Sequence, residues 1–315
     1  MNVRDPNFSL DLMDFFVEKA IEPFHHEQID NLDIGQEIRF CGVKFEENDC
    51  YICSQCAIDH FDRKQAEVNY NCPQRNNIYA IRSMVCHATE ISSLLDGTLL
   101  QSESDFVDNF FKNKVEVNVA SIGYASGTDL LAILRYFSSD KLFSVKKLNV
   151  FRIDKNAEKW QESANLTEQF IRENADLIFD FQIKTNELPA KKVDVFILSY
   201  ILNELNQSEI DEIITSISKS ASNKFVIIIN EVNKYKFDDS KYFDYTINKI
   251  DKNFNRVSYV KGHYPYELSN GRYGIKREYD YSCKYKDIIT EGFRKEFAVK
   301  LYLQSKFYLA EYHNK

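Results

Sequence analysis

The sequence is poor in the two residues that interrupt regular structure, with 9 glycines and 5 prolines in 315 residues. Such scarcity makes a glycine in a turn informative, because glycine permits backbone conformations and close approaches that other residues resist. Long apolar runs are also lacking, and none approaches the roughly 18 residues that a membrane-spanning helix needs. We therefore expect no membrane segment, and the sequence shows no internal repeat.

Positive charge is in deficit, since 40 Lys and Arg face 48 Asp and Glu, a net charge of −8. This balance disfavours extended nucleic-acid binding, for which clustered basic residues supply most of the affinity. Residues 1–25 have no basic start followed by an apolar core, so we expect no signal peptide and a cytoplasmic location. The composition is otherwise ordinary for a globular protein, and it leaves the oligomeric state open.

The cysteines are clustered in one segment of the sequence. Five of the seven cysteines lie within residues 41–72, and in a reducing compartment such a cluster indicates a metal site or free thiols rather than disulfides. Cys53 and Cys56 have the spacing of a zinc-binding pair, with Cys72 as a further candidate ligand. Free buried thiols are the alternative interpretation. His60, Cys41 and His87 are other candidates for the fourth ligand.

The chain divides near residue 115 into a helical, cysteine-rich cap region over residues 1–114 and an α/β domain over residues 115–315. In the cap region, apolar residues recur every three or four positions over 9–22 and 77–95, which predicts two amphipathic helices. Arg82, His87 and Glu90 fall on the second of them. We favour the interpretation that they form a solvent-facing polar stripe; the alternative is that they point into a cleft.

After residue 115, short β-branched runs alternate with amphipathic stretches, the pattern of a parallel sheet covered by helices. The predicted strands span residues 115–122, 148–153, 177–183, 193–198 and 225–229. Aromatic-rich segments at 257–260, 276–285 and 299–312 predict antiparallel strands at the sheet edge. The predicted fold class is α/β: a Rossmann-like, doubly wound, mostly parallel sheet with an antiparallel C-terminal edge, preceded by an N-terminal helical, cysteine-containing cap.

In an open sheet of this kind, ligands bind beyond the carboxyl ends of the strands. The first predicted strand runs into Ser121–Gly127, which reads S-x-G-x-A-x-G and holds two of the nine glycines. The second ends at Asp154, whose carboxylate can accept hydrogen bonds from ribose hydroxyls. The turn has neither the Gly-Lys-Ser/Thr of a phosphate loop nor the G-x-G-x-x-G of a dinucleotide site.

Residues 115–232 resemble the cofactor half of class I S-adenosylmethionine-dependent methyltransferases. The glycine turn, the acid at Asp154 and the block from Asp194 to Leu205 carry this resemblance. It implies a reversed last strand, S-adenosylmethionine as cofactor and in-line methyl transfer to an acceptor that the sequence does not identify. Phe181 would lie along the adenine and Ser199 near the methyl group. The cofactor residues implied are Gly123, Tyr124, Ala125, Gly127, Asp154, Phe181 and Ser199.

The turn departs from the family pattern at two positions. Ala125 replaces the middle glycine, and Ser121 stands where the family has an acid, with Asp129 as a candidate to compensate. The candidate catalytic residues are Tyr200, Asn203 and Glu204, after the fourth predicted strand; their other interpretation is the start of a helix that packs on the core. A non-catalytic methyltransferase-like domain that acts as a binding or interaction protein, with or without a zinc-stapled N-terminal module, is the alternative function.

Overall fold

A computed structural model describes residues 1–21, 76–77, 79–97, 105–138, 144–185, 188–232, 240–263 and 305–315. The five cysteines of the cluster lie outside these ranges, and so does the segment predicted as a strand over residues 276–285. No helix in the described ranges combines the length and the apolar character needed to span a bilayer.

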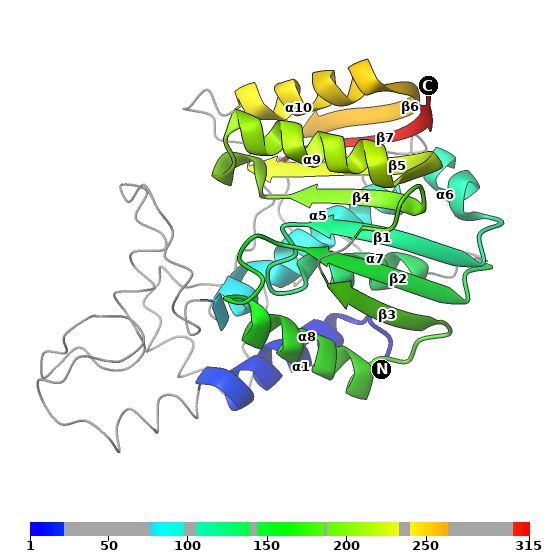
Figure 1. Cartoon of the computed structure of the whole chain (residues 1–315). Helices are drawn as coiled ribbons and strands as arrows, with labels where there is room; N and C mark the ends of the chain where they lie inside the picture. Colours follow the sequence, from blue (N-terminus) through cyan, green and yellow to red (C-terminus); the bar gives the residue numbers. More distant parts are fainter. Residues whose placement is uncertain are drawn as a thin grey trace, which may run out of the picture.

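The centre of the molecule is a seven-stranded sheet in the order β3-β2-β1-β4-β5-β7-β6 (Figure 1). The first five strands pair in parallel, whereas β7 is antiparallel to both β5 and β6. Because the order reverses between β1 and β4, the connections after these strands diverge and leave a crevice between them. The strands are β1 (Glu116–Ile122), β2 (Lys147–Ile153), β3 (Asp180–Thr185), β4 (Val193–Ser199), β5 (Ala221–Val232), β6 (Phe254–His263) and β7 (Ser305–Asn314).

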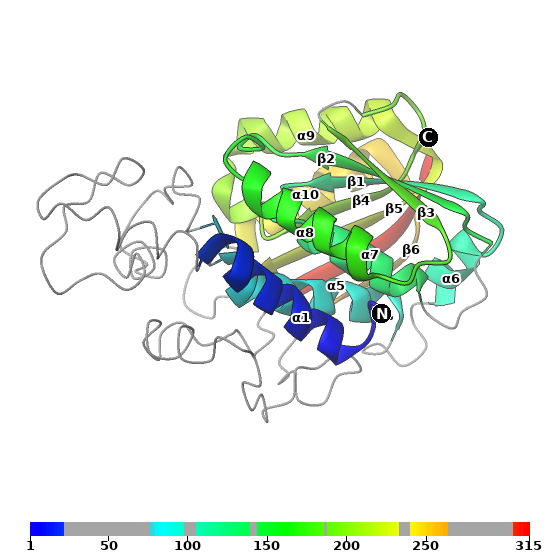
Figure 2. The same cartoon turned by 90° about the horizontal axis from the view of Figure 1, so that it is seen from below.

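Helices cover both faces of the sheet (Figure 2). The first face carries α1 (Pro6–Phe16) with its π-helical continuation η1 (Val17–Ile21), η2 (Ala80–Met84) leading into α5 (Val85–Leu95), α6 (Asp105–Phe111), α7 (Thr128–Phe137) and α8 (Gln161–Asn174). The second face carries α9 (Gln207–Ser220) and α10 (Ser240–Asn253). The sheet is therefore buried on both sides, as its parallel strands require.

Strand β4 shows how the sequence produces this sandwich. Val195 and Ile197 belong to the core under α5 and α7, whereas Phe196 and Leu198 belong to the core under α9 and α10. All four side chains are almost fully buried. Since alternate residues of a strand point to opposite faces, a strand with two buried faces is a continuous apolar run. The predicted fold class is confirmed in its sheet and its antiparallel strands.

Strand β7 lies inside the sheet, with β6 as the edge strand. Its Tyr308 and Tyr312 are buried, and their hydroxyls are 2.6 Å apart. The Tyr312 hydroxyl also donates to Asp251 of α10 at 2.7 Å. This burial explains the tyrosine content of the strand, because each ring contributes a large apolar area while its hydroxyl finds a polar partner.

The described helices of the first part of the chain share one core with the sheet. Phe8 and Phe16 of α1, Ile91 of α5 and Phe111 of α6 pack in one cluster with α7, α8 and the first face of the sheet. The division at residues 114 and 115 stays a prediction, because residues 22–75, which would belong to the cap region, lie outside the described ranges.

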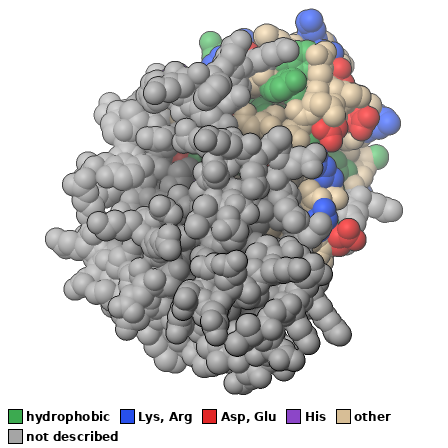
Figure 3. All heavy atoms as spheres, turned by 90° about the vertical axis from the view of Figure 1, so that its left-hand side faces the viewer, with side chains coloured by type: hydrophobic (Ala, Val, Ile, Leu, Met, Phe, Trp, Pro, Cys, Tyr) green, Lys and Arg blue, Asp and Glu red, His purple; other side chains and the backbone are tan. Residues whose placement is uncertain are grey.

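Where Figure 3 shows described side chains, basic and acidic groups are intermixed at the surface.

Candidate functional site

A cavity of about 670 Å³ opens at the carboxyl ends of β1, β2 and β4, the place where a doubly wound sheet binds its ligands. Its floor is formed by residues at the ends of these strands: Gly123 and Asp154 directly follow β1 and β2, and Ser199 is the last residue of β4. The size falls within the range of sites for small molecules. The sequence predicted a ligand site beyond these strand ends, and the cavity lies at that place.

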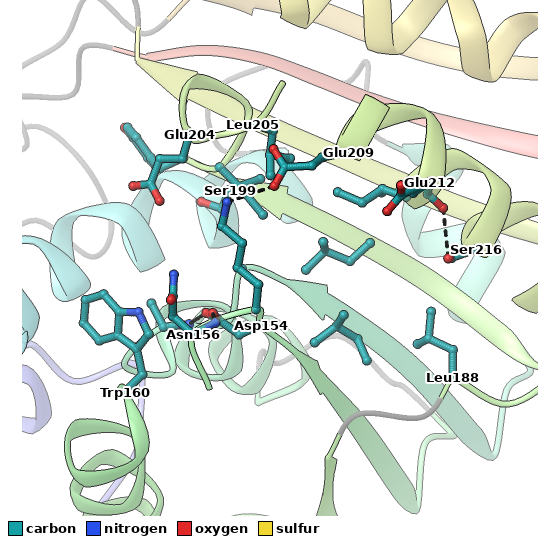
Figure 4. Close-up of a pocket in the computed structure, with 18 of the residues that line it drawn as sticks. Asp154, Asn156, Trp160, Leu188, Ser199, Glu204, Leu205, Glu209, Glu212 and Ser216 are labelled. Atoms are coloured by element: carbon teal, nitrogen blue, oxygen red, sulfur yellow. Dashed lines mark hydrogen bonds and ion pairs between the residues drawn. The ribbon is translucent and has the colours of Figure 1, made fainter. Parts of the chain in front are cut away.

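The cavity has two distinct ends, with Asp154 between them (Figure 4). We call one the aromatic end; it is lined by Tyr79, Trp160, Tyr200 and Glu204. We call the other the α9 end; it is lined by Leu188, Glu212 and Ser216.

The turn after β1 approaches the cavity with its backbone. Gly123 has φ of 81°, Gly127 has φ of 97° and Ala125 has φ of 46°, so this short turn visits the left-handed region three times. A Cβ on Gly123 would lie 2.8 Å from Cδ1 of Ile201, and one on Gly127 would lie 3.1 Å from Cγ2 of Thr167. Gly123 and Ala125 line the cavity, whereas Gly127 ends the turn as the N-cap of α7. The two glycines are therefore required by sterics.

Asp154 ties the first two connections together. Its Oδ2 accepts the backbone N–H of Ala125 at 3.0 Å, and its Oδ1 accepts the backbone N–H of Asn156 at 2.7 Å. A carboxylate has about four lone-pair positions, so each oxygen can still accept another donor. Asp154 lines the cavity, and a vicinal diol of a ligand can use these positions.

Ser121, which stands at the position of the family's acid, is hydrogen-bonded to Asp129 beneath the turn. The Ser121 hydroxyl donates to Oδ2 of Asp129 at 2.5 Å, and both residues are buried. Burial raises the pKa of Asp129 to about 7, although the Ser121 hydrogen bond opposes that shift. Asp129 does not line the cavity, so in this structure it supports the turn from below.

The turn after β4 forms the inner wall of the cavity. Tyr200 has φ of 56°, a left-handed conformation that is rare for a bulky side chain, and its backbone N–H donates to the Asn230 carbonyl at 2.7 Å. Asn203 donates to Glu231 at 2.6 Å, and the same carboxylate accepts the Leu202 N–H at 2.9 Å. Asn203 thus fastens the turn to β5 and does not line the cavity, whereas Tyr200 and Glu204 do.

Tyr200 is held by residues from the first part of the chain. Its hydroxyl donates to Oε2 of Glu90 at 2.5 Å, and the Asn230 amide donates to the same oxygen at 2.9 Å. The His87 ring stacks on the Tyr200 ring, with centroids 3.7 Å apart. Burial, and next the Glu90 carboxylate, raise the pKa of Tyr200 well above that of a free tyrosine, so its phenol stays protonated at neutral pH.

The interpretation of His87 and Glu90 as a solvent-facing stripe is wrong, because they are 5% and 0% exposed. Their one sequence signal is a histidine and a glutamate at i and i+3 on a largely apolar helix, which places them on one face but does not say what that face meets.

Two other predicted cofactor residues have side chains elsewhere. Phe181 is the second residue of β3, pairs with Leu148 and lines a separate groove at the amino end of the strand. Its predicted place along an adenine is wrong because β3 starts three residues later than the sequence indicated, with Ile178 outside it and 75% exposed. Tyr124 is buried, and its hydroxyl donates to Glu168 of α8 at 3.2 Å, so it does not line the cavity.

The zinc prediction falls on residues outside the described ranges, since Cys53, Cys56 and Cys72 all lie there. Within the described ranges, no group of three or more His, Cys, Asp or Glu side chains is arranged to hold a metal ion. His87, a candidate fourth ligand, contacts Tyr79 and Tyr200 instead.

No family model matches the chain, and no curated protein matches its sequence. Solved structures do resemble it at low identity. A SAM-dependent methyltransferase from Archaeoglobus fulgidus is 13% identical, with 69% of this chain and 98% of that chain covered and a TM-score of 0.34. A SAM-dependent methyltransferase from Methanosarcina mazei is 10% identical, with 66% and 96% covered and a TM-score of 0.39. The N-methyltransferase NodS from Bradyrhizobium japonicum, solved with S-adenosyl-L-homocysteine, is 13% identical, with 63% and 78% covered and a TM-score of 0.35.

Proposed function

We propose that the chain is an S-adenosylmethionine-dependent methyltransferase whose cofactor occupies the cavity at the carboxyl ends of β1, β2 and β4. The observation that carries the proposal is the position of Asp154. It directly follows β2, lines the cavity and is hydrogen-bonded to the backbone of the glycine turn. A carboxylate at this place in a doubly wound sheet is suited to the two hydroxyls of a ribose.

The residues present fit the parts of this cofactor. The backbone at Gly123 and Ala125 leaves room for a ligand to approach, and Asp154 offers acceptors for the ribose. Leu188, from the connection after β3, takes over the place proposed for Phe181 beside the adenine. Ser199 lies on the floor between the two ends. The antiparallel β7 also agrees with the reversed last strand that the family resemblance implies.

When bound, the cofactor supplies a methyl group activated by a positively charged sulfur. The chain's own contribution is to hold both partners in line and to exclude water. We assign Tyr200 and Glu204 to the acceptor side, because both line the aromatic end of the cavity. Asn203 is a positioning residue, acting through its hydrogen bond to Glu231.

Calorimetric titration with S-adenosylmethionine and S-adenosylhomocysteine tests the proposal. We expect micromolar binding to the full chain and at least about a hundredfold weaker binding to Asp154→Asn, since hydrogen bonds to a charged group contribute about 1.5–3 kcal/mol each. Asp180→Asn is the matched control, because Asp180 is an exposed acid at the opposite end of a neighbouring strand. Thermal unfolding of both variants separates loss of binding from loss of fold.

Unchanged affinity in Asp154→Asn would show that the assignment of the site is wrong. Absence of binding to the wild-type chain at millimolar ligand would favour the interaction-domain alternative. The departures from the family pattern at Ser121 and Ala125 would then explain the loss of cofactor binding. Zinc content measured on the same sample tests the separate prediction for Cys53, Cys56 and Cys72.

A further inference from the structure

Three aromatic side chains line the aromatic end of the cavity. Tyr79 and Trp160 pack edge to face, with centroids 5.5 Å apart, and both line the cavity. Tyr200 lines it from the end of β4 and is backed by the stacked ring of His87. Tyr79 is tied to that pair, since its hydroxyl lies 3.4 Å from Nδ1 of His87. The arrangement comes from three separate parts of the chain.

Carboxylates surround these rings. Glu204 lines the aromatic end itself, and Glu90 lies directly behind the Tyr200 hydroxyl. Burial raises the pKa of Tyr79, and the charges that raise it further are those of Glu204, Asp129, Glu231 and Glu90. Glu204 and Glu90 therefore place negative charge beside the rings.

Among the residues that the structure describes, the basic side chains that line the cavity are Lys155 and Lys219. Lys155 forms an ion pair with Glu209 of α9, with Nζ and Oε1 3.2 Å apart. Lys219 belongs to the last turn of α9, away from the strand ends. The aromatic end therefore combines three aromatic rings with negative charge, which together attract an organic cation and disfavour an anionic group.

We propose that the aromatic end binds the ammonium group of the methyl acceptor, so that the substrate class is an amine. For transfer, the ammonium first gives a proton to the Glu204 carboxylate; the freed nitrogen lone pair then bonds to the methyl carbon while the carbon–sulfur bond breaks, which releases S-adenosylhomocysteine. This inference rests on the proposed function and extends it from the cofactor to the acceptor. A cation over the faces of Tyr and Trp is stabilised by the ring quadrupoles, and more strongly where water is displaced. The carboxylates add a longer-range attraction without requiring a direct ion pair.

Trp160 makes the subsite measurable, because it is the single tryptophan of the chain. The chain is first saturated with S-adenosylhomocysteine and then titrated with choline, whose trimethylammonium head is charged at every pH. The neutral isostere 3,3-dimethylbutan-1-ol and sodium chloride at equal concentration serve as reference titrations. We expect a saturable change in Trp160 fluorescence with choline alone, and no release of S-adenosylhomocysteine in a parallel equilibrium dialysis.

Two variants and a matched control locate the site. Tyr79→Leu removes a ring, and Glu204→Gln removes a charge while keeping the shape of the side chain. Each should weaken choline binding about tenfold, in line with the size of cation–π and partly buried charge interactions. Glu212→Gln makes the same chemical change at the α9 end of the cavity and should leave choline binding within about twofold.

Equal responses to choline and its neutral isostere, or none to either, would overturn the inference while leaving the proposed function standing. Displacement of S-adenosylhomocysteine by choline would also overturn it, because the cation site would then belong to the cofactor. Absence of S-adenosylhomocysteine binding in the calorimetric experiment would instead refute the proposed function, and with it the assignment to an acceptor.

Discussion

The floor and the inner wall of the cavity are built in different ways. The floor is made of backbone, where Gly123 and Ala125 turn under one carboxylate that lies 29 residues after Ala125. The wall is made of side chains, where Tyr200 is held by Glu90, 110 residues before it in the chain. The floor therefore depends on the absence of Cβ atoms and the wall on the presence of specific polar atoms. We therefore expect the floor to be damaged by added side-chain atoms and the wall by the removal of polar atoms.

The largest effect is expected in the wall, from Glu90→Ala. This change removes the acceptor of both the Tyr200 hydroxyl and the Asn230 amide, and Glu90 and Asn230 are buried. Each donor that loses its acceptor costs about 1–3 kcal/mol, so we expect the free energy of unfolding to fall by about 4 kcal/mol. Urea unfolding followed by circular dichroism measures it.

Glu90→Gln keeps an oxygen acceptor and should cost only about 1 kcal/mol. Glu173→Ala is the surface control, since Glu173 is an exposed acid near the end of α8, and should change the free energy by less than about 0.5 kcal/mol. If Glu90→Ala cost no more than Glu173→Ala, the wall would not be held by side chains as described.

The same contrast explains what the sequence revealed. The floor was predicted because its signals are local: two glycines in one turn, and an acid at the end of the next apolar run. The order of apolar runs and amphipathic stretches also predicted the doubly wound sheet, since strands buried on both faces are continuously hydrophobic. Residues of this kind are identified by their neighbours in the sequence.

Tyr200 and Glu204 of the wall were predicted as candidates, but the support of Tyr200 by His87 and Glu90 was missed because these contacts are long-range. His87 and Glu90 have the spacing of one helix face, but only the packing of α5 against the end of β4 determines that this face meets Tyr200. Phe181 was misplaced for a related reason. The apolar run from Leu177 continues into β3, and the start of pairing between Asp180 and Lys147 sets the strand boundary. Pairing partners of this kind leave no local signal.

The second-largest effect is the pH dependence of the free energy of unfolding, which Asp129 beneath the floor should produce. The pKa of Asp129 is about 7 in the folded protein against 3.8 for an ordinary aspartate. Between about pH 4 and pH 7 the unfolded chain therefore releases this proton while the folded chain keeps it. Stability from this group is full below pH 4 and is lost as the pH rises through this window. The loss corresponds to about 3 kcal/mol.

Asp129→Asn keeps an oxygen for the Ser121 hydroxyl but cannot ionise. Relative to the wild-type chain, its free energy of unfolding should rise by about 3 kcal/mol between pH 4.5 and pH 8, as measured by urea unfolding at both pH values. Asp180→Asn, at an exposed site, should show no comparable change. Parallel pH curves for Asp129→Asn and the wild-type chain would mean that Asp129 is ionised in the fold.

The smallest effects are expected from adding or removing a single methyl group in the floor. Gly123→Ala places a Cβ at φ of 81° and within 2.8 Å of the Ile201 side chain, so it should cost about 1–2 kcal/mol of stability and weaken S-adenosylhomocysteine binding. Ala125→Gly relieves a left-handed alanine but adds freedom to the unfolded chain, so stability should change by less than about 1 kcal/mol.

The affinity for S-adenosylhomocysteine distinguishes a glycine that lines the cavity from one that only supports the turn. Gly127→Ala should destabilise the chain about as much as Gly123→Ala, because its φ is 97° and its Cβ would meet Thr167, yet Gly127 does not line the cavity. Calorimetry should therefore show weaker S-adenosylhomocysteine binding for Gly123→Ala, unchanged binding for Gly127→Ala and a few-fold gain for Ala125→Gly. Equal loss of affinity in both glycine variants would mean that the turn acts on the cavity only through its stability, and not through backbone that contacts the ligand.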